Sequence, residues 1–266
     1  MKLRIDKMLS NIGLGSRKQI KADAKNGCIK INNVIVKDSS KIIDTDEDEV
    51  KYKDKIAKYV QYIYLMMNKP AGVVSATEDN YDKTVIDLLE DKDKFYEPFP
   101  VGRLDKDTEG LLLITNDGQL AHNLLSPKKH VDKVYYAEID MELTKEDVKA
   151  FEEGVVFLDD GYKTMPAKLD IIMSPVIQNE NNVILSAVEE FPSYTNKCRV
   201  TIKEGKFHQV KKMFQAVDKE VIYLKRISMG PIKLDETLRL GEYRHLTENE
   251  VKCLGTFLYP QRLSQN

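Results

Sequence analysis

The first 43 residues alternate apolar and polar positions in a well-punctuated pattern. Apolar residues recur at helical spacing from Leu3 to Ile12 and glycines follow them, which predicts a helix that ends there. Ser16 and Gln19 form a capping-box pair, because each side chain can satisfy a backbone N–H at the start of a second helix. Two short apolar runs around an Asn-Asn turn then predict a hairpin. The expected unit is helix, helix, hairpin, with strands over 28–31 and 34–36.

From Tyr59 onward, apolar strands mix with helical patterns and show no regular strand–helix–strand spacing. A strand over 59–67 opens this part, and a Lys-Pro-Ala-Gly turn closes the strand. The other predicted elements are helices over 83–91, 118–125, 144–153, 208–217 and 247–258, strands over 111–115, 134–140, 167–173, 183–188, 198–203 and 221–224, and a loop over 174–182. We expect an α+β fold, with a small helix–helix–hairpin domain over 1–58 and a mostly antiparallel, mixed α/β domain over 59–266.

The composition indicates in which compartment the protein works and which kinds of site it contains. Of the 266 residues, 42% are hydrophobic and 32% charged, and no window approaches about 18 uninterrupted apolar residues. We therefore expect no membrane span, and the charged N-terminus lacks the apolar run of a secretory signal. The three cysteines, Cys28, Cys198 and Cys253, lie far apart, as is typical of free thiols in a reducing cytoplasm. The four histidines form no HxxxH or HExxH pattern, so we expect no metal site.

Charge is distributed unevenly. The whole chain has a net charge of −2, yet residues 1–41 contain ten Lys or Arg and three acidic residues, a local charge of +7. Such a block can attract phosphates whatever the charge of the rest. A solvated, lysine-rich helix face is the alternative interpretation. The residues that we expect to contact phosphate, on or just before the two helices, are Arg4, Arg17, Lys18 and Lys21.

The most unusual stretch runs from Gly102 to Gly118 and reads GRLDKDTEGLLLITNDG. A charged loop leads directly into a strongly apolar strand, so a loop carboxylate is held by a rigid element and can still reach a ligand. The spacing matches neither a P-loop nor a dinucleotide-binding motif. Asp105 and Asp107 could suggest a glycoside hydrolase pair, but near-adjacent loop residues rarely provide the defined carboxyl separation that such a pair needs. Without further information, a charged turn is the simplest interpretation.

The order of the N-terminal motifs resembles that of the S4 domain, a small RNA-binding module. The resemblance covers about 45 residues and rests on RIDKML, then GSRK, then NGCIKIN. It implies that the module binds structured RNA, largely through shape and phosphates, and positions an attached domain.

The rest of the chain resembles the pseudouridine synthases, specifically the RsuA family of ribosomal RNA enzymes. The matching segments are MNKPAG at 67–72, GRLDxxTxGLLLxTxDG from 102, KVY at 133–135, EGKFHQVKKM at 204–213, and LKR with MG at 224–230. The span between Asp170 and Arg199 is longer than that family usually has at this place. The acidic stretch 87–93 and the tail beyond 259 match the family poorly. The resemblance implies that the domain over 59–266 is catalytic.

Carried over position by position, the resemblance identifies Asp105 as the catalytic aspartate. It identifies Tyr135 as the active-site tyrosine and Lys211 as the basic residue paired with the aspartate. Leu224 corresponds to the apolar residue that closes the pocket. The further residues that we expect to contact RNA or brace the loop are Arg103, Arg226 and His208.

These residue types fit the reaction that the resemblance implies. Pseudouridine formation breaks the N1–C1′ bond, turns the base and joins C5 to C1′, with no redox step or hydrolysis, so we expect no cofactor. The carboxylate of Asp105 can act on either the sugar or the base as nucleophile or general base, and a nearby Lys211 favours its ionised form. The uridine must leave its stack, and Tyr135 supplies an aromatic wall and a hydroxyl near C5.

We expect the substrate to be ribosomal RNA and the protein to be a monomer. The form His208-Gln209-Val210-Lys211 favours the 16S RNA of the small subunit, free or in an assembling particle, over 23S RNA. A non-catalytic ribosome-assembly factor and a nucleoside hydrolase are the competing functions. The first is disfavoured by the joint presence of the three catalytic residue types, and the second predicts release of free uracil.

Overall fold

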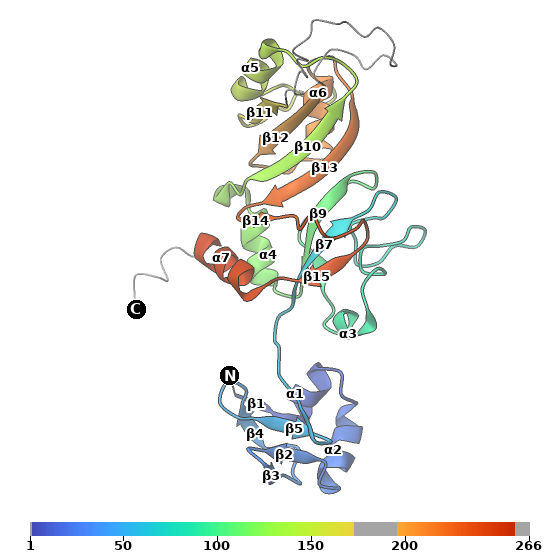
Figure 1. Ribbon diagram of the computed structural model, residues 1–266, viewed down its shortest axis with the longest axis vertical. Coiled ribbons are helices and arrows are strands. Elements are labelled where there is room, and N and C mark those ends of the chain that lie inside the picture. The colour runs from blue at the N-terminus through green and yellow to red at the C-terminus, as the bar shows by residue number, and fades with distance from the viewer. Residues whose placement is uncertain (1, 173–195, 259–266) are drawn as a thin grey trace, which may run out of the picture.

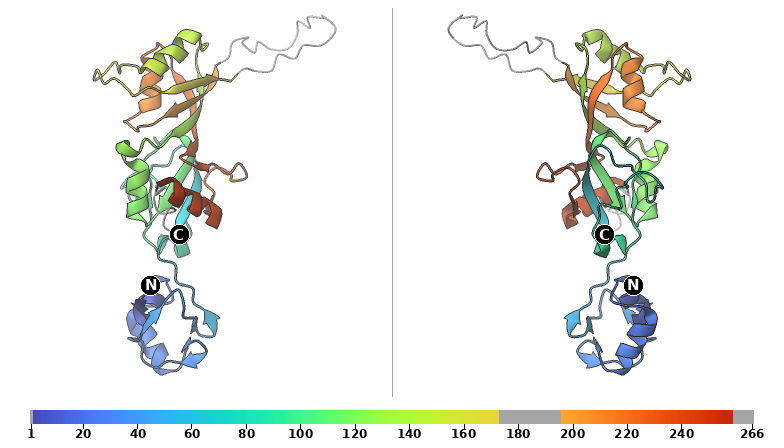
Figure 2. Two further views of the ribbon diagram at one scale, coloured as in Figure 1. Left: turned by 90° about the vertical axis from the view of Figure 1, so that its left-hand side faces the viewer. Right: turned by 90° about the vertical axis from the view of Figure 1, so that its right-hand side faces the viewer.

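A computed structural model describes residues 2–172 and 196–258 of the chain. The strand predicted over 183–188 and the loop predicted over 174–182 lie outside these residues. Within the described part, no helix combines the length and the apolar character that crossing a membrane requires. In Figures 1 and 2 the N-terminal elements form a separate lobe that one extended stretch joins to the rest of the chain.

The N-terminal lobe contains two helices and two small sheets. Its elements are β1 (Lys2–Arg4), α1 (Ile5–Asn11), α2 (Arg17–Lys25), β2 (Ile29–Ile31), β3 (Val34–Ile35), β4 (Ile42–Asp44), β5 (Val50–Tyr52) and β6 (Lys55–Ile56). The helix–helix–hairpin order is as predicted, and Asn32 and Asn33 both adopt the left-handed conformation of a tight hairpin turn. The first helix begins later than predicted, because Leu3 lies in β1, which pairs with β4. The remaining four-stranded sheet has the order β3-β2-β5-β6, so β5 and β6 extend the predicted hairpin.

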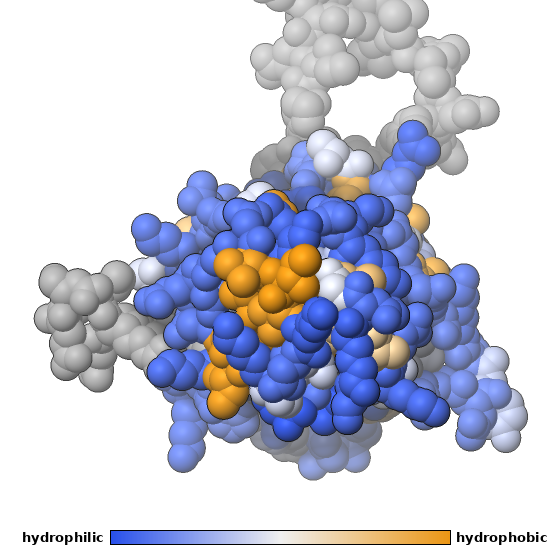
Figure 3. All heavy atoms as spheres, turned by 90° about the horizontal axis from the view of Figure 1, so that it is seen from below, coloured by the Kyte–Doolittle hydropathy of each residue, from blue (hydrophilic) through white to orange (hydrophobic). Residues whose placement is uncertain are grey.

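One apolar core holds this lobe together. Buried side chains from both helices and the sheets pack together between residues 3 and 57, and Tyr59 packs against them. The division of the chain at residue 58 stays a prediction. Some apolar side chains instead face solvent, and Figure 3 shows an apolar patch within a hydrophilic surface at the far end of the lobe. The exposed large apolar residues of this lobe are Leu14, Val34, Ile35, Ile42 and Ile56.

The second part of the chain is built on one long sheet. Its elements are β7 (Tyr64–Lys69), α3 (Asp91–Lys94), β8 (Phe99–Pro100), β9 (Glu109–Thr115), α4 (Gly118–Leu125), the 3₁₀ turn η1 (Pro127–Lys129), β10 (Lys133–Ile139), α5 (Lys145–Glu153), β11 (Lys168–Ile171), β12 (Lys197–Ile202), α6 (Gln209–Gln215), β13 (Val221–Met229), β14 (Ile232–Lys233), β15 (Tyr243–His245) and α7 (Glu248–Leu258). The strand order is β11-β12-β10-β13-β9-β7-β15, with β14 on β13 and β8 on β9. Only the β9–β13 pair among these is parallel, which confirms the mostly antiparallel α+β class.

Helix boundaries follow the capping signals closely. The Thr144 and Asp147 side chains cap each other's backbone at the start of α5, and Thr247 and Glu250 do the same at α7. The helix predicted over 83–91 was wrong. That segment forms successive turns in which Asp87 accepts hydrogen bonds from the backbone and hydroxyl of Thr84, and a short helix, α3, follows instead.

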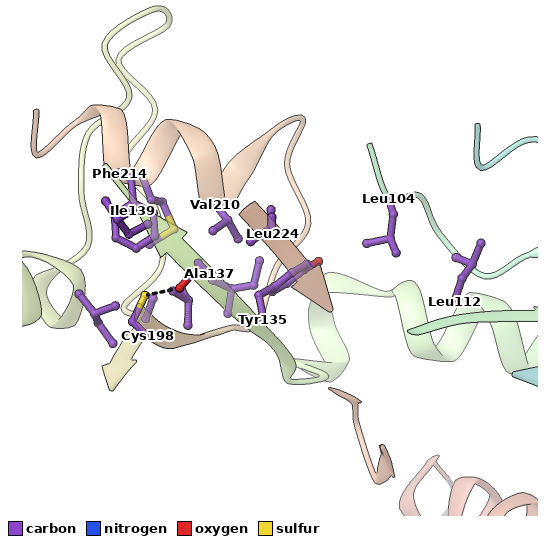
Figure 4. Close-up of a cluster of buried hydrophobic side chains, with 14 of the residues drawn as sticks. Leu104, Leu112, Tyr135, Ala137, Ile139, Cys198, Val210, Phe214 and Leu224 are labelled. Atoms are coloured by element: carbon purple, nitrogen blue, oxygen red, sulfur yellow. Dashed lines mark hydrogen bonds between the residues drawn. The ribbon is translucent and has the colours of Figure 1, made fainter. Parts of the chain in front are cut away.

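Strand β9 is buried on both faces of the sheet, which explains its unbroken apolar run. Leu111 and Leu113 point into a core with α4 and α7, whereas Leu112 and Ile114 point into a second core with α5 and α6. Figure 4 shows part of the second core, where side chains from β10, β12, β13 and α6 pack together. Because successive side chains of β9 pack into opposite cores, the strand is held on both sides and anchors the motif loop that precedes it.

Candidate active site

Asp105 lies on the loop between β8 and β9, and a buried lysine organises this loop. Lys69 at the end of β7 is fully buried, and its Nζ donates to the carbonyl oxygens of Pro70 (3.0 Å), Asp105 (3.0 Å), Lys106 (3.3 Å) and Thr108 (2.9 Å). Burial lowers the pKa of Lys69 to about 8, against the opposing effect of nearby carboxylates. The ammonium therefore acts as an internal clamp on the backbone that carries Asp105.

Two further contacts fix the same loop. The Ser75 hydroxyl accepts a hydrogen bond from the Leu104 amide at 3.0 Å and donates to its carbonyl at 2.9 Å. Gly110 has a φ of +100°, and a Cβ there would lie 2.3 Å from the Arg226 carbonyl. Only glycine permits this approach of β9 to β13, so the motif places glycine where the two strands meet.

The Asp105 carboxylate faces two basic side chains of α6 and its N-terminal turn. Lys211 Nζ lies 3.6 Å from Oδ2, and His208 Nε2 lies 3.5 Å from Oδ1. Lys211 is closer to Asp107, whose two carboxylate oxygens it contacts at 2.6 and 2.7 Å. The pKa of Asp107 is lowered by this lysine, although its partial burial acts in the opposite direction. Lys211 therefore bridges both aspartates of the motif.

Tyr135 and Leu224 form an apolar wall beside these groups. Both are buried, at 8% and 5% exposure, and they come from the adjacent strands β10 and β13. Figure 4 shows the Tyr135 ring extending from β10 with Leu224 beside it, and Leu104 on the opposite side. Val210 of α6 packs in the same core. A flat apolar ligand can thus pack between this wall and the aspartate loop.

Two buried cations lie in the lining. Arg226 is 2% exposed, its Nε donates to the Leu111 carbonyl at 2.8 Å, and its Nη2 has no hydrogen-bond partner among the described residues. Lys133 is also buried and donates to the Val131 carbonyl. Burial, together with the nearby Arg226 charge, lowers the pKa of Lys133 to about 8. The floor of the site is therefore cationic.

Asp105, the apolar wall and the two buried cations line one cavity of about 860 Å³. The sequence-predicted residues that it brings together are Arg103, Asp105, Tyr135, His208, Leu224 and Arg226, and Lys211 reaches Asp105 from α6. Arg103 is exposed at the rim, so it is placed to contact a ligand rather than to brace the loop. Within residues 2–172 and 196–258, no group of three His, Cys, Asp or Glu side chains has the arrangement of a metal site.

The four basic residues predicted to bind phosphate lie on the N-terminal lobe, and all are exposed. Arg4 forms a two-point ion pair with Asp6, with its Nη2 2.6 Å from Oδ2. This contact lowers the pKa of Asp6, with a smaller contribution from Arg17. Arg4 and Lys21 also lower the pKa of Asp38, after the larger effect of Ser40. These residues share one surface, in which acidic side chains offset part of the positive charge.

Three residues that shape the site had no role predicted from the sequence. Glu204 is buried and accepts hydrogen bonds from Tyr162 Oη, the Met165 amide and Gln209 Nε2. Lys69 and Lys133 are the other two. Lys69 ends β7 beside Asn68 and Pro70, and Lys133 begins β10 after Asp132, so neither lysine stands out as a charge inside an apolar run.

Comparisons with known proteins agree with this geometry. The family described as RNA pseudouridylate synthase matches residues 63–216, and the S4 domain matches residues 3–50. A Bacillus subtilis protein named uncharacterized RNA pseudouridine synthase YtzG is 49% identical over 95% of this chain and 98% of its own length. Ribosomal small subunit pseudouridine synthase A of Yersinia pestis is 35% identical over 95% of this chain and 98% of its own length.

A solved structure extends the agreement to three dimensions. A crystal structure of a pseudouridylate synthase superposes with a TM-score of 0.61 at 33% identity, covering 95% of this chain and 99% of its own. The sequence matches and the shared fold cover nearly the whole length of both chains. The chain therefore belongs to the RNA pseudouridylate synthase family, in its RsuA branch, and is an isomerase that combines an S4 RNA-binding domain with the synthase fold.

Proposed function

We propose that this protein converts one uridine of 16S ribosomal RNA to pseudouridine, with Asp105 as the catalytic carboxylate. The observation that supports it best is the convergence of Asp105, Tyr135 and Lys211 from a loop, a strand and a helix beside one cavity. The relatives named ribosomal small subunit pseudouridine synthase A support the choice of 16S RNA. We expect a monomer that works in the cytoplasm on free RNA or on an assembling small subunit.

The geometry supports a division of labour within the cavity. Asp105 is ready to act as nucleophile or base, because the Lys211 ammonium faces one of its oxygens and offsets its negative charge, while His208 Nε2 faces the other oxygen. The flipped uracil stacks against Tyr135 and Leu224, which also exclude water. The N1–C1′ bond breaks, the base turns, and C5 bonds to C1′ while the C5 proton departs near the Tyr135 hydroxyl. Every atom except that exchanged proton stays in the product.

The other predicted residues either contact the RNA or support the cavity. Arg103 at the rim reaches the sugar–phosphate backbone of the target nucleotide. Arg4, Arg17, Lys18 and Lys21 of the S4 domain bind phosphates further from the reacting base. Arg226 braces β9 against β13 through the Leu111 carbonyl, and it shapes the floor of the cavity.

One assay tests the proposal. Transcripts of 16S and 23S RNA carrying tritium at C5 of uridine are incubated with the wild-type protein and with Asp105→Asn, which keeps size and removes charge. We expect tritium release from 16S RNA without free uracil, and no release by the variant. Tritium release from 23S RNA alone would contradict the assignment of 16S RNA as the substrate. Free uracil would indicate a hydrolase, and RNA binding without release would indicate a non-catalytic assembly factor.

A further inference from the structure

Phe207 at the rim of the cavity is an aromatic ring that the fold leaves in water. It is 71% exposed and lines the cavity. Isolated exposed apolar residues are common on protein surfaces, so exposure alone indicates nothing. Three further observations distinguish this ring.

The first is that the loop presenting Phe207 is pinned on both sides. Glu204 is held by three hydrogen bonds, from Tyr162, Met165 and Gln209. Gln209 also accepts from the Lys206 amide at 2.9 Å. His208 adopts a φ of +52°, which is costly for a residue with a side chain. The outward direction of the ring is therefore built into the turn.

The second is that Phe207 stacks on a residue of the active site. Its ring lies 3.8 Å from the His208 ring, centroid to centroid, with 19° between the planes. His208 in turn lies 3.5 Å from Asp105. Two stacked rings thus extend from the reacting carboxylate to the surface. His208 lies beside Asp105, and Phe207 is the outer ring.

The third is the charge around the ring. The Lys206 ammonium lies 4.3 Å from the neighbouring Tyr162 ring, and the Lys212 ammonium, which pairs with Asp159 at 2.7 Å, lies 5.5 Å from the Phe207 centroid. An aromatic surface flanked by cations suits a nucleobase with its phosphate, because the base stacks while the cations offset the backbone charge. An apolar protein surface would have to desolvate these lysines, which is unfavourable.

We propose that Phe207 is a stacking platform for the nucleobase adjacent to the target uridine, which makes the substrate subsite at least one nucleotide wider than the uridine pocket. This inference rests on the proposed function, since it assumes that the uridine enters beside Asp105. Stacking is tolerant of base identity, so the platform contributes affinity and orientation rather than sequence choice.

The test compares protein variants against RNA that lacks one base. The probe is a fluorescein-labelled oligoribonucleotide with one uridine among adenosines, made intact and with an abasic site 5′ or 3′ of the uridine. The variants are Phe207→Ala, Phe207→Trp and Ile222→Ala, the last being a control residue that is 67% exposed on β13. Dissociation constants come from fluorescence anisotropy, and KM and kcat come from tritium release on 16S RNA.

We expect Phe207→Ala to weaken binding of intact RNA about 5- to 150-fold, the range for one stacked base. Phe207→Trp restores the affinity, and Ile222→Ala leaves it unchanged. On one of the two abasic RNAs, the wild type and Phe207→Ala bind equally. On 16S RNA, the alanine variant raises KM more than it lowers kcat.

Two results would overturn the platform: an unchanged affinity for intact RNA, or the same loss on all three RNAs. A defect seen only with ribosomal particles would assign the ring to a protein partner and would also overturn it. Failure of the proposed function looks different. In that case the wild type releases no tritium from 16S RNA, while the anisotropy comparison still decides the role of Phe207.

Discussion

The S4 lobe and the catalytic cavity are both rich in cations, but they hold them differently. In the lobe, Arg17, Lys18 and Lys21 are exposed, and Arg17 and Lys21 lie near enough to Asp6 and Asp38 to lower the pKa of those carboxyl groups. Around the cavity, Lys69 and Arg226 are almost completely buried and donate to backbone carbonyls. The buried cations of this chain therefore bind its own backbone, whereas the exposed cations of the lobe remain accessible from solvent.

This difference predicts how each region responds to change. A buried ammonium that satisfies several carbonyls fixes geometry, and its loss leaves those carbonyls unpaired in the interior. An exposed cation costs the fold little to lose, and its energy appears only when phosphate displaces its counterions. Substitutions in the cavity should therefore change stability and turnover, whereas substitutions in the lobe should change affinity and its dependence on salt.

The largest effect is expected from Lys69→Met, which keeps the length of the side chain and removes its charge. Four carbonyls lose their shared donor, so we expect the free energy of unfolding to fall by about 3 kcal/mol or more and tritium release to fall at least about 100-fold. Urea unfolding measures the change in free energy, and the tritium assay measures the change in turnover. Lys92→Met is the matched control, because Lys92 forms an exposed ion pair with Glu90. Equal unfolding curves for both variants would contradict the clamp.

The same lysine predicts a pH dependence. Its pKa is lowered to about 8 in the folded chain, against about 10.4 when unfolded. Between these values the unfolded chain binds more protons at this residue, so the wild type gains stability relative to Lys69→Met as pH rises. Turnover should fall over that range, because the neutral amine has fewer donors for the loop. A difference in unfolding free energy that stays flat from about pH 7 to about pH 10 would refute this coupling.

Lys211→Met should have an intermediate effect. The ammonium lies between Asp105 and Asp107, so its loss leaves two carboxylates facing each other without a bridging cation. We expect kcat to fall about 100-fold with a small change in KM, because the missing charge acts on the reacting group. Lys149→Met on the exposed face of α5 is the control. A rise in KM at unchanged kcat would place Lys211 in RNA binding instead.

Sequence patterns predicted the parts of this molecule that depend on local chemistry. The helices predicted over 144–153 and 247–258 begin where Thr144 and Thr247 cap the first turn, and the predicted apolar strand over 111–115 is the interior strand β9. The helix predicted over 83–91 failed because Asp87 bonds back to Thr84 and stabilises turns, which a pattern of apolar positions does not register. Strand β1 was missed because its partner β4 lies some 40 residues away in sequence.

The prediction of active-site residues from the sequence has the same limit. The resemblance to known enzymes named Asp105, Tyr135 and Lys211, and the fold brings all three to one cavity. The role of Lys69 was hidden, because it depends on carbonyls contributed by a loop more than thirty residues later. Long-range backbone contacts of this kind leave no periodic trace in a sequence.

The smallest effect on the fold is expected from Arg17→Ala combined with Lys18→Ala. Both residues are exposed at the start of α2, so unfolding should be unchanged. Two lost phosphate contacts should reduce the salt slope of RNA affinity by about 2, so that from about 50 to about 200 mM salt the wild type loses roughly tenfold more affinity than the variant. Arg17→Lys combined with Lys18→Arg keeps the charge and should keep the slope. If affinity for 16S RNA showed the same slope in all three proteins, the exposed cations of the lobe would have no part in binding, and the contrast with the cavity would rest on burial alone.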